Sequence, residues 1–305
     1  MRARFWVLAL ALGWSVPAMA QQEQVIAVPG FADFLVVDGD AVWATNKGRV
    51  ERWARDGLKA TVPMAHPCGA MAFTRDTLWV ADCDTRTLNR VDARTGKVVA
   101  AITTGVANPA GELNVVTGAG SVWIASDAKG VVSRVDPATD GVIATVAVTP
   151  GTSYLAFGFD AVWAVSLEGR TVQRIDPATN TVVATIPLGT DPGFLAAGEG
   201  AVWVQEQGDG TVARVDPATN AVTGRVKVGA KLAYGDIDTG GGKVWLRTTE
   251  EQTYAVIDPQ TLTVTARVGK AVGSGALRYT PEGIWTSAHD HHTLSWWPNP
   301  ATVGK

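Results

Sequence analysis

A tryptophan-centred phrase returns seven times along this chain at a nearly constant spacing. Each copy ends a short apolar stretch, as in Ala201-Val202-Trp203. Successive copies lie 36 to 44 positions apart, as the residue numbers show: Trp43, Trp79, Trp123, Trp163, Trp203, Trp245 and Trp285. Such a period is typical of repeat architectures, in which each unit buries its apolar faces by stacking on its neighbours. We expect the indoles to pack between repeats rather than to stack on a ligand.

One repeat unit contains four short segments with the character of strands. In the fifth unit these are Phe194–Ala197, Ala201–Val204, Thr211–Val215 and Ala221–Val228, separated by turns rich in glycine, aspartate and asparagine. No window shows sustained helical periodicity. Four strands in up-and-down order form one blade of a propeller. The sequence therefore predicts an all-β, seven-bladed β-propeller with four antiparallel strands per blade.

The two ends of the chain are expected to meet in the last blade. That blade supplies strands near 276–279, 283–287 and 293–297, and then the chain ends. The segment Gln24–Gly30 precedes the first blade and has the pattern of a fourth strand. An N-terminal strand that completes the seventh blade would close the ring and leave no exposed sheet edge between its first and last repeats.

Aspartates recur in an Asp-Pro-x-Thr-Asn pattern between the third and fourth strands. Copies occur at 136–140, 176–180 and 216–220, with weaker versions at 92–96 and 258–261. Proline sets φ at the first turn position, aspartate bonds local N–H groups, and asparagine accepts the left-handed conformation. These carboxylates are therefore interpreted as turn formers and not as acid–base catalysts.

The first twenty residues have the pattern of a secretory signal peptide. A basic head with Arg2 and Arg4 precedes an apolar stretch and the small-residue site Ala18-Met19-Ala20. The propeller domain is then expected to span residues 21–305, in a periplasmic or secreted protein without a membrane span. Removing the two arginines leaves 24 basic and 29 acidic residues. With no basic patch, nucleic acid is not an expected partner, and a monomer is predicted.

The two cysteines, Cys68 and Cys83, flank a predicted hairpin. If Arg75 and Asp76 form its two-residue turn, the two cysteines lie directly opposite each other. Opposed cysteines are spaced for a disulfide, and an exported protein permits one. No Cys-x-x-Cys spacing points to a metal site instead.

Propeller loops that follow the second strands share a face with the connections between blades, around the central channel. That face is the usual binding site in such folds. The polar and aromatic side chains expected to bind a ligand there are His66, Glu112, Tyr154, Glu206, Tyr234, His289 and His291. Three of the four histidines fall in one segment, 289–292, which fits either a solvated loop or a group of ligands. No nucleophile elbow, phosphate loop or dinucleotide fingerprint is present.

The repeats resemble those of the YVTN/YncE-type propellers and are similar to those of virginiamycin B (streptogramin) lyases. The resemblance covers essentially the whole chain after residue 20, and is carried by segments such as 202–204, 212–220 and 180–189. In the lyases, glutamates three positions after the repeat tryptophan hold a divalent metal beside a histidine base. Here only Glu206 keeps that glutamate, and His289 and His291 stand four and six places after Trp285.

Binding through the channel face, to a small molecule or a protein and without a required cofactor, is the function that these observations favour. The enzyme alternative is a metal-assisted lyase or lactonase, with Glu206 and His289 as catalytic candidates and Glu112 and Glu206 as candidate ligands of a divalent metal. A third alternative is an assembly scaffold that uses the rim of the propeller and has no small-ligand site.

Overall fold

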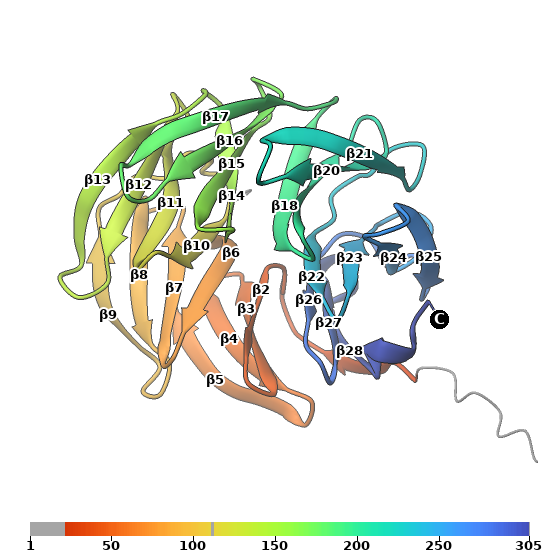
Figure 1. Ribbon diagram of the computed structural model, residues 1–305. Coiled ribbons are helices and arrows are strands. Elements are labelled where there is room, and N and C mark those ends of the chain that lie inside the picture. Colours follow the sequence, from red (N-terminus) through yellow and green to blue (C-terminus); the bar gives the residue numbers. More distant parts are fainter. Residues whose placement is uncertain (1–21, 111–112, 305) are drawn as a thin grey trace, which may run out of the picture.

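Seven four-stranded antiparallel sheets surround a central axis in the computed structural model, which describes residues 22–110 and 113–304 (Figure 1). The expected seven-bladed propeller is thereby confirmed. The proposed signal peptide and Glu112 lie outside the described residues. Two short 3₁₀ helices, η1 (His289–His291) and η2 (Pro300–Thr302), are the only helical elements in the described part of the chain.

The inner two strands of each blade carry most of the buried residues. The innermost strands, in blade order, are β2 (Leu35–Asp38), β6 (Pro67–Thr74), β10 (Val115–Gly118), β14 (Thr152–Gly158), β18 (Pro192–Gly198), β22 (Ile237–Gly240) and β26 (Leu277–Tyr279). The second strands are β3 (Ala41–Asn46), β7 (Thr77–Asp82), β11 (Ser121–Asp127), β15 (Ala161–Ser166), β19 (Ala201–Glu206), β23 (Lys243–Arg247) and β27 (Gly283–Ala288).

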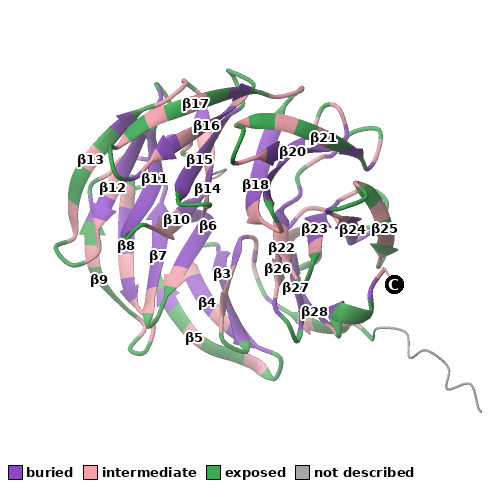
Figure 2. Cartoon of the chain, in the orientation of Figure 1, coloured by how far each residue is buried: buried purple, intermediate pink, exposed green. Residues whose placement is uncertain are grey.

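The outer two strands of each blade form the rim. The third strands are β4 (Arg49–Ala54), β8 (Thr87–Asp92), β12 (Val131–Asp136), β16 (Thr171–Asp176), β20 (Thr211–Asp216), β24 (Tyr254–Asp258) and β28 (Thr293–Pro298). The outermost strands are β5 (Gly57–Pro63), β9 (Lys97–Ile102), β13 (Gly141–Ala147), β17 (Thr181–Pro187), β21 (Ala221–Lys227), β25 (Thr263–Val268) and β1 (Gln24–Ala27). Figure 2 shows exposed residues concentrated on these outermost strands.

The ring is closed by the N-terminal strand, as expected. Strand β1 pairs antiparallel with β28, with Gln24 opposite Trp296 and Ala27 opposite Thr293. The backbone N–H of Val28 then donates to the carbonyl of His292. The innermost strands contact one another around the whole ring, including β2 against β26 where the first and last blades meet. The first and last repeats are thus joined both at the axis and at the rim.

The seven repeat tryptophans pack between blades, as expected. Each is at most 1% exposed. Several indole N–H groups donate to the carbonyl five residues earlier, as Trp163 does to Gly158 and Trp203 to Gly198. Burying an indole contributes a large apolar area, and satisfying its N–H removes the cost of burying a polar group. The recurrent phrase is therefore a structural element of the ring.

The recurrent aspartates form turns. In the fifth blade the Asp216 carboxylate accepts the N–H of Ala218 at 2.8 Å, and Asn220 has a φ of 53°. The N–H of Ala218 is the main reason that the pKa of Asp216 lies below its ordinary value. Neighbouring blades are linked by the same turns, since the guanidinium of Arg174 donates to the carbonyl of Pro217 at 2.8 Å. The turn interpretation is confirmed.

The disulfide between Cys68 and Cys83 is formed, with 6.0 Å between their Cα atoms. The expected register holds only near the turn, where Thr74 faces Thr77. A bulge shifts the ladder, so that Cys68 lies opposite Ala81 and not opposite Cys83. The bond therefore joins two residues that are offset along the hairpin. The direct opposition that we inferred from the sequence is wrong, and the pairing of the cysteines is confirmed.

Within the described residues there is no helix of the length and apolar character that crossing a bilayer requires.

Candidate functional site at the channel mouth

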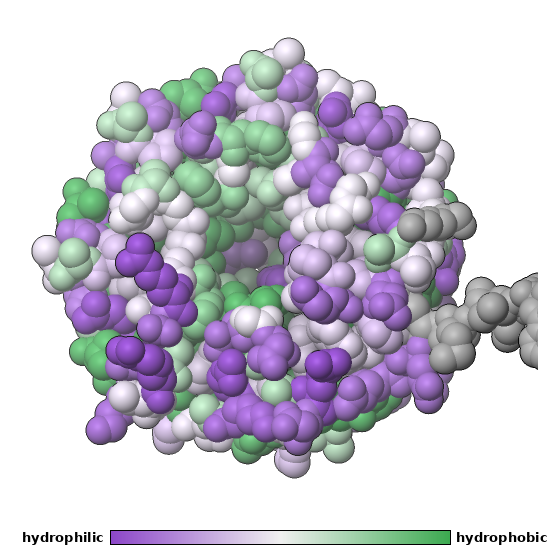
Figure 3. Space-filling model, turned by 60° about the horizontal axis from the view of Figure 1, so that its bottom comes forward, coloured by the Kyte–Doolittle hydropathy of each residue, from purple (hydrophilic) through white to green (hydrophobic). Residues whose placement is uncertain are grey.

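Loops from all seven blades meet on one face of the propeller because strand direction alternates within each blade. The turn after each second strand and the connection into the next blade therefore emerge at the same end of the channel. Figure 3 shows a hollow at the centre of the ring, with hydrophobic residues on part of its wall. We call the hollow on the face of these loops the channel mouth.

Two adjoining cavities form the channel mouth. The first, of about 200 Å³, lies over blades one and two and is lined by Lys47, His66 and Cys68 among others. The second, of about 390 Å³, lies over blades six and seven and is lined by Tyr234, Ser274 and His289 among others. Both cavities share four lining residues: Phe31, Asp33, Phe34 and Ala110. We refer to them as the blade-one cavity and the blade-seven cavity.

Aromatic rings form much of the wall of the channel mouth. Phe31, on the connection into blade one, stacks on the imidazole of His289, with 4.0 Å between ring centroids. Phe34 and Phe194 come from blades one and five, which are not neighbours in the ring, and yet their centroids lie 6.1 Å apart. Tyr154 packs on Phe194 at 4.6 Å. The Phe34–Phe194 contact therefore spans the channel, and both rings line the blade-seven cavity.

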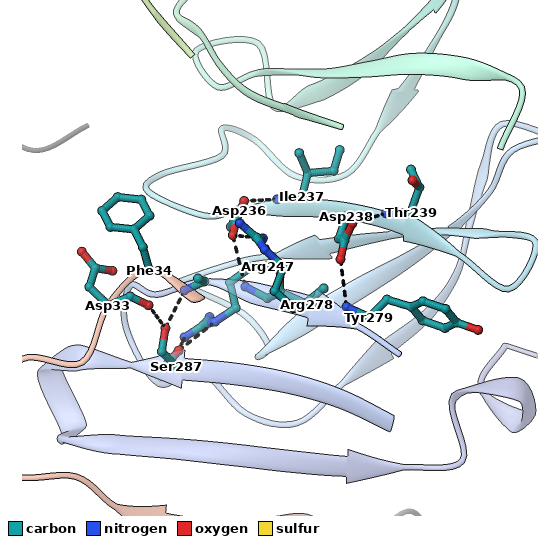
Figure 4. Close-up of polar contacts among 12 residues, drawn as sticks. Asp33, Phe34, Asp236, Ile237, Asp238, Thr239, Arg247, Arg278, Tyr279 and Ser287 are labelled. Atoms are coloured by element: carbon teal, nitrogen blue, oxygen red, sulfur yellow. Dashed lines mark hydrogen bonds and ion pairs between the residues drawn. The ribbon is translucent and has the colours of Figure 1, made fainter. Parts of the chain in front are cut away.

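Three carboxylates line the blade-seven cavity, from Asp33, Asp236 and Asp290. Asp236 is buried and paired with the guanidinium of Arg278, and it also accepts the N–H of Ile237 at 2.8 Å (Figure 4). Asp290 is exposed and lies beside the imidazole of His289. Figure 4 shows the Asp33 side chain directed away from Ser287, whose hydroxyl donates to the Asp33 carbonyl.

His289 is the titratable ring nearest the aromatic wall. Its side chain is 12% exposed, and burial lowers the pKa of the imidazole below its ordinary 6.5. The Nδ1 atom lies 3.0 Å from the Asp290 carboxylate. This nitrogen is buried. His289 is therefore mainly neutral at neutral pH.

A buried guanidinium lies behind the wall of the mouth. Arg247 is 1% exposed and uses all its N–H groups on backbone carbonyls. Nε and Nη2 donate to Ser287, Nη2 also to Gly273, and Nη1 to Thr248 and Thr253. Burial lowers the pKa of Arg247 to about 10, so the side chain stays charged at neutral pH. Its role here is to tie blade six to blade seven.

The structure brings three of the expected ligand-binding residues to the channel mouth. His66 lines the blade-one cavity, and Tyr234 and His289 line the blade-seven cavity. Tyr154 lines neither cavity but packs against Phe194, which lines the second. Tyr234 is 68% exposed and lies at the solvent side of the blade-seven cavity. His291 is exposed on η1 and does not line either cavity.

Glu206 lies apart from the residues that line the mouth. Its carboxylate is fully buried in blade five, where it accepts from Arg225 at 2.8 Å and 2.9 Å and from Thr211 at 2.7 Å. It lines neither cavity, so the structure does not bring it together with His289. In the described part of the chain, no three histidine, cysteine, aspartate or glutamate side chains are grouped closely enough to hold a metal ion.

Several residues of the mouth were missed by sequence reasoning. Phe31, Asp33 and Phe34 lie on the connection into blade one, and Phe194 lies at the start of β18. Our selection from these connections favoured polar side chains over the apolar rings. The sequence did contain a signal for these rings. Phe31 and Phe34 lie in a short connecting segment, 30–34, outside the expected strands, so the core of a blade does not require them.

Comparison with known proteins supports the fold. No protein-family model matches the chain, and a search of curated sequences gives no significant match. Among solved structures, virginiamycin B lyase from Staphylococcus aureus superposes with a TM-score of 0.77 at 15% identity, covering 92% of this chain and 99% of that one. A structure of streptogramin B lyase gives 0.75 at 13% identity, over 91% of this chain and 96% of that chain. BamB from Moraxella catarrhalis gives 0.66 at 16% identity, covering 87% and 84%.

These neighbours share the propeller architecture with this chain, as the repeats indicated. One of the lyase structures is of an inactive variant with quinupristin. At such low identity the likeness establishes the fold alone.

Proposed function

We propose that this protein is a binding module that holds a small molecule at the channel mouth. The observation that carries the proposal is the pair of adjoining cavities, of about 200 and 390 Å³, with shared aromatic walls. Concave sites with apolar walls and a few convergent polar groups are the usual form of a small-molecule site. Phe34 and Phe194, which meet across the channel, line the larger of the two cavities.

Binding is favoured over catalysis because the candidate catalytic groups do not converge. A lyase or lactonase needs two or three acid, base or ligand groups within reach of one point. Glu206 is held by Arg225 in blade five, while His289 stacks on Phe31 at the mouth. The cavity offers rings and hydroxyl or carboxylate groups for recognition, which is sufficient for binding.

The proposed place of action is outside the cytoplasm, in the periplasm or in the surrounding medium. The Cys68–Cys83 disulfide supports this proposal, because such bonds persist in oxidising compartments and are rare in the cytosol. Fractionation of cells that express the full chain, followed by mass determination of the N-terminus, would test it. A protein retained in the cytoplasm with its first twenty residues intact would contradict it.

A fragment screen tests the binding function. We expect small aromatic fragments to bind the wild-type protein and to shift NMR signals of the blade-one, blade-six and blade-seven loops. Phe31→Ala and Tyr234→Ala should each weaken binding, because the two rings line the mouth. Phe159→Ala is the matched control, since this exposed ring lies in the turn between β14 and β15 on the opposite face. Failure of all fragments to bind at millimolar concentration, or binding that survives both substitutions unchanged, would overturn the proposal.

A further inference from the structure

A further cavity lies away from the channel mouth, between blades two and three, which are neighbours in the ring (Figure 1). Its volume of about 550 Å³ is larger than that of either cavity of the mouth. The turn after β7, the connection from β9 into blade three, and strands β11, β12 and β13 line it. We call it the blade-three cleft. Small-molecule sites usually have volumes of about 300–1,000 Å³, and the cleft falls within that range.

The cleft lies at a place that a longer side chain occupies in blade four. Ser133 lies ten positions after Trp123 on the third strand of blade three, and Gln173 lies ten positions after Trp163 in blade four. The amide oxygen of Gln173 accepts the N–H of Thr149, in the connection into blade four, at 2.7 Å. A serine side chain is too short to bridge the sheet and the connection in this way. In blade three the space beside Ser133 stays open.

Blades five and six fill the same place from their outermost strands. Arg225 on β21 is held there by Glu206, and Arg267 on β25 donates to the carbonyl of Val228 in the connection into blade six. The corresponding residue of β13 in blade three is Thr145, whose side chain is much shorter. Blade three thus has short hydroxyl side chains where its neighbours have long ones, and the cleft is the space that results.

Three hydroxyl groups that line the cleft already use their protons within the protein. Ser126 donates to the carbonyl of Val131 at 3.3 Å, and Ser133 donates to the Ser126 hydroxyl at 2.8 Å. Thr104 donates to the carbonyl of Gly105 at 2.9 Å. Because a carbonyl oxygen can only accept, the direction of these bonds is fixed, and the three hydroxyls keep lone pairs but no proton for a ligand. A ligand that bonds them must therefore be the donor.

Two charged side chains of opposite sign also line the cleft among the described residues. Arg86 and Asp127 are both exposed there, and one Asp127 oxygen accepts the N–H of Lys129 at 2.8 Å. The guanidinium supplies N–H donors, and the carboxylate supplies a further acceptor. An oxyanion has only acceptors, so it would match Arg86 but would face the lone pairs of Ser126 and Ser133. Since the two charges cancel, a neutral ligand is favoured.

We propose that the blade-three cleft binds a neutral polyhydroxylated molecule, a mono- or disaccharide. Each hydroxyl group of a sugar can donate and accept at once, so sugar hydroxyls donate to Ser126 and Ser133 and accept from Arg86. Pro109, which is exposed on the wall of the cleft, offers an apolar surface to the C–H groups of the ring. The cleft shares no lining residue with the two cavities of the channel mouth, so this is a second site beyond the proposed function.

A panel of neutral sugars tests the inference: glucose, galactose, maltose and sucrose. Each is titrated into the ¹⁵N-labelled protein and followed by NMR. We expect at least one of them to bind at millimolar concentration and to shift the backbone signals of Arg86, Gly105 and Ser133, which line the cleft. Sodium sulfate carries acceptors only, so it should bind at least about threefold more weakly than that sugar.

Two substitutions locate the site. Ser133→Gln copies Gln173 of blade four and should fill the cleft, which would weaken sugar binding at least about tenfold. Arg86→Gln should weaken it about threefold to tenfold, because the charged donor is lost. Arg170→Gln is the matched control and should leave binding unchanged. Arg86 and Arg170 are both exposed in the turn after a second strand, with φ of 54° and 49°, but in blade four Gln173 occupies the place of the cleft.

Each result supports or contradicts the inference. If no sugar of the panel binds at millimolar concentration, or if sulfate binds as tightly as the sugars, the hydrogen-bonding argument is wrong. If a sugar binds Ser133→Gln as tightly as wild type, the cleft is not its site. Melting temperatures show whether Ser133→Gln folds. Should it not fold, the exposed Arg86 decides, since unchanged affinity in Arg86→Gln would also remove the sugar from the cleft. None of these outcomes alters the case for a ligand at the channel mouth.

Discussion

The carboxylate of Glu206 and the guanidinium of Arg225 form two parallel hydrogen bonds, 2.8 Å and 2.9 Å long, between the second and fourth strands of blade five. Burial opposes ionisation of Glu206. Hydrogen bonds from Arg225, Thr211 and the N–H of Gly189 outweigh it, so the pKa of Glu206 lies below its ordinary 4.5. A glutamate that the sequence offered as a metal ligand therefore has its acceptor sites occupied by the protein itself.

This pair should make the stability of the propeller depend on pH in the acid range. Because the folded-state pKa is lowered, the stabilisation is present above about pH 4.5 and is lost as the pH falls through the folded-state value. Glu206→Gln should lower the free energy of unfolding by about 1–3 kcal/mol at neutral pH. The difference in free energy of unfolding between this variant and wild type, measured by urea titration, should become smaller below pH 4.5. Glu168→Gln, an exposed glutamate near the same face, is the control. A deficit that stays constant with pH would contradict the argument.

The disulfide should contribute measurably to stability. Cys68 and Cys83 are separated by 15 positions, and cross-linking a loop of that length is worth about 3 kcal/mol through the unfolded chain. Replacing both cysteines by serine should therefore lower the melting temperature by several degrees. A thiol reductant should lower the wild-type value similarly and leave the double variant unchanged. Equal melting temperatures for wild type and the double variant would show that the bond adds no stability.

Substitution of Arg247 should lower the free energy of unfolding more than substitution of most other residues. Arg247→Met would leave buried carbonyls of Ser287 and Gly273 without donors, at a cost of about 3–5 kcal/mol. Arg247→Lys should restore little, because an ammonium cannot reproduce the planar fork of five N–H groups. Denaturant unfolding measures both. Arg214→Met in the neighbouring blade is the control, because the Arg214 guanidinium donates to the exposed hydroxyl of Thr223. If Arg247→Lys is as stable as wild type, the argument from the number of hydrogen bonds that Arg247 donates is wrong.

The architecture was predictable because its determinants are local and repeated. Each indole marks the same place in a four-strand unit, and seven copies give the number of blades directly. The hairpin around Arg75 shows where such reasoning stops. The turn of this hairpin and the register beside it follow from the alternation of residues, but the bulge that places Cys68 opposite Ala81 does not. Gly69, within that bulge, lies close against Leu113 in the connection into the next blade. Packing between blades has no short-range signal in the sequence.

The candidate site was only partly predictable, for a similar reason. The topology alone places His66, Tyr234 and His289 on one face, and all three line the mouth. Glu206 lies at the end of a second strand as well, but its partner Arg225 is on the fourth strand of the same blade. The ladder Glu206–Thr211–Lys227 places Arg225 diagonally beyond Thr211, so the pair could have been found by following the register across three strands.

Protonation of His289 should lower the stability of the fold in mildly acidic solution. Burial holds the pKa of the imidazole below its ordinary 6.5, against the neighbouring Asp290 carboxylate, which favours the protonated form. Because the unfolded chain then binds this proton more readily than the folded one, the free energy of unfolding should be highest above about pH 6.5 and should fall as the pH drops through the folded-state pKa. His289→Phe keeps a ring on Phe31 and removes the titration, so the free energy of unfolding of this variant should depend less on pH over the same range. Urea titrations of both proteins measure the effect, and profiles of equal slope would contradict the argument.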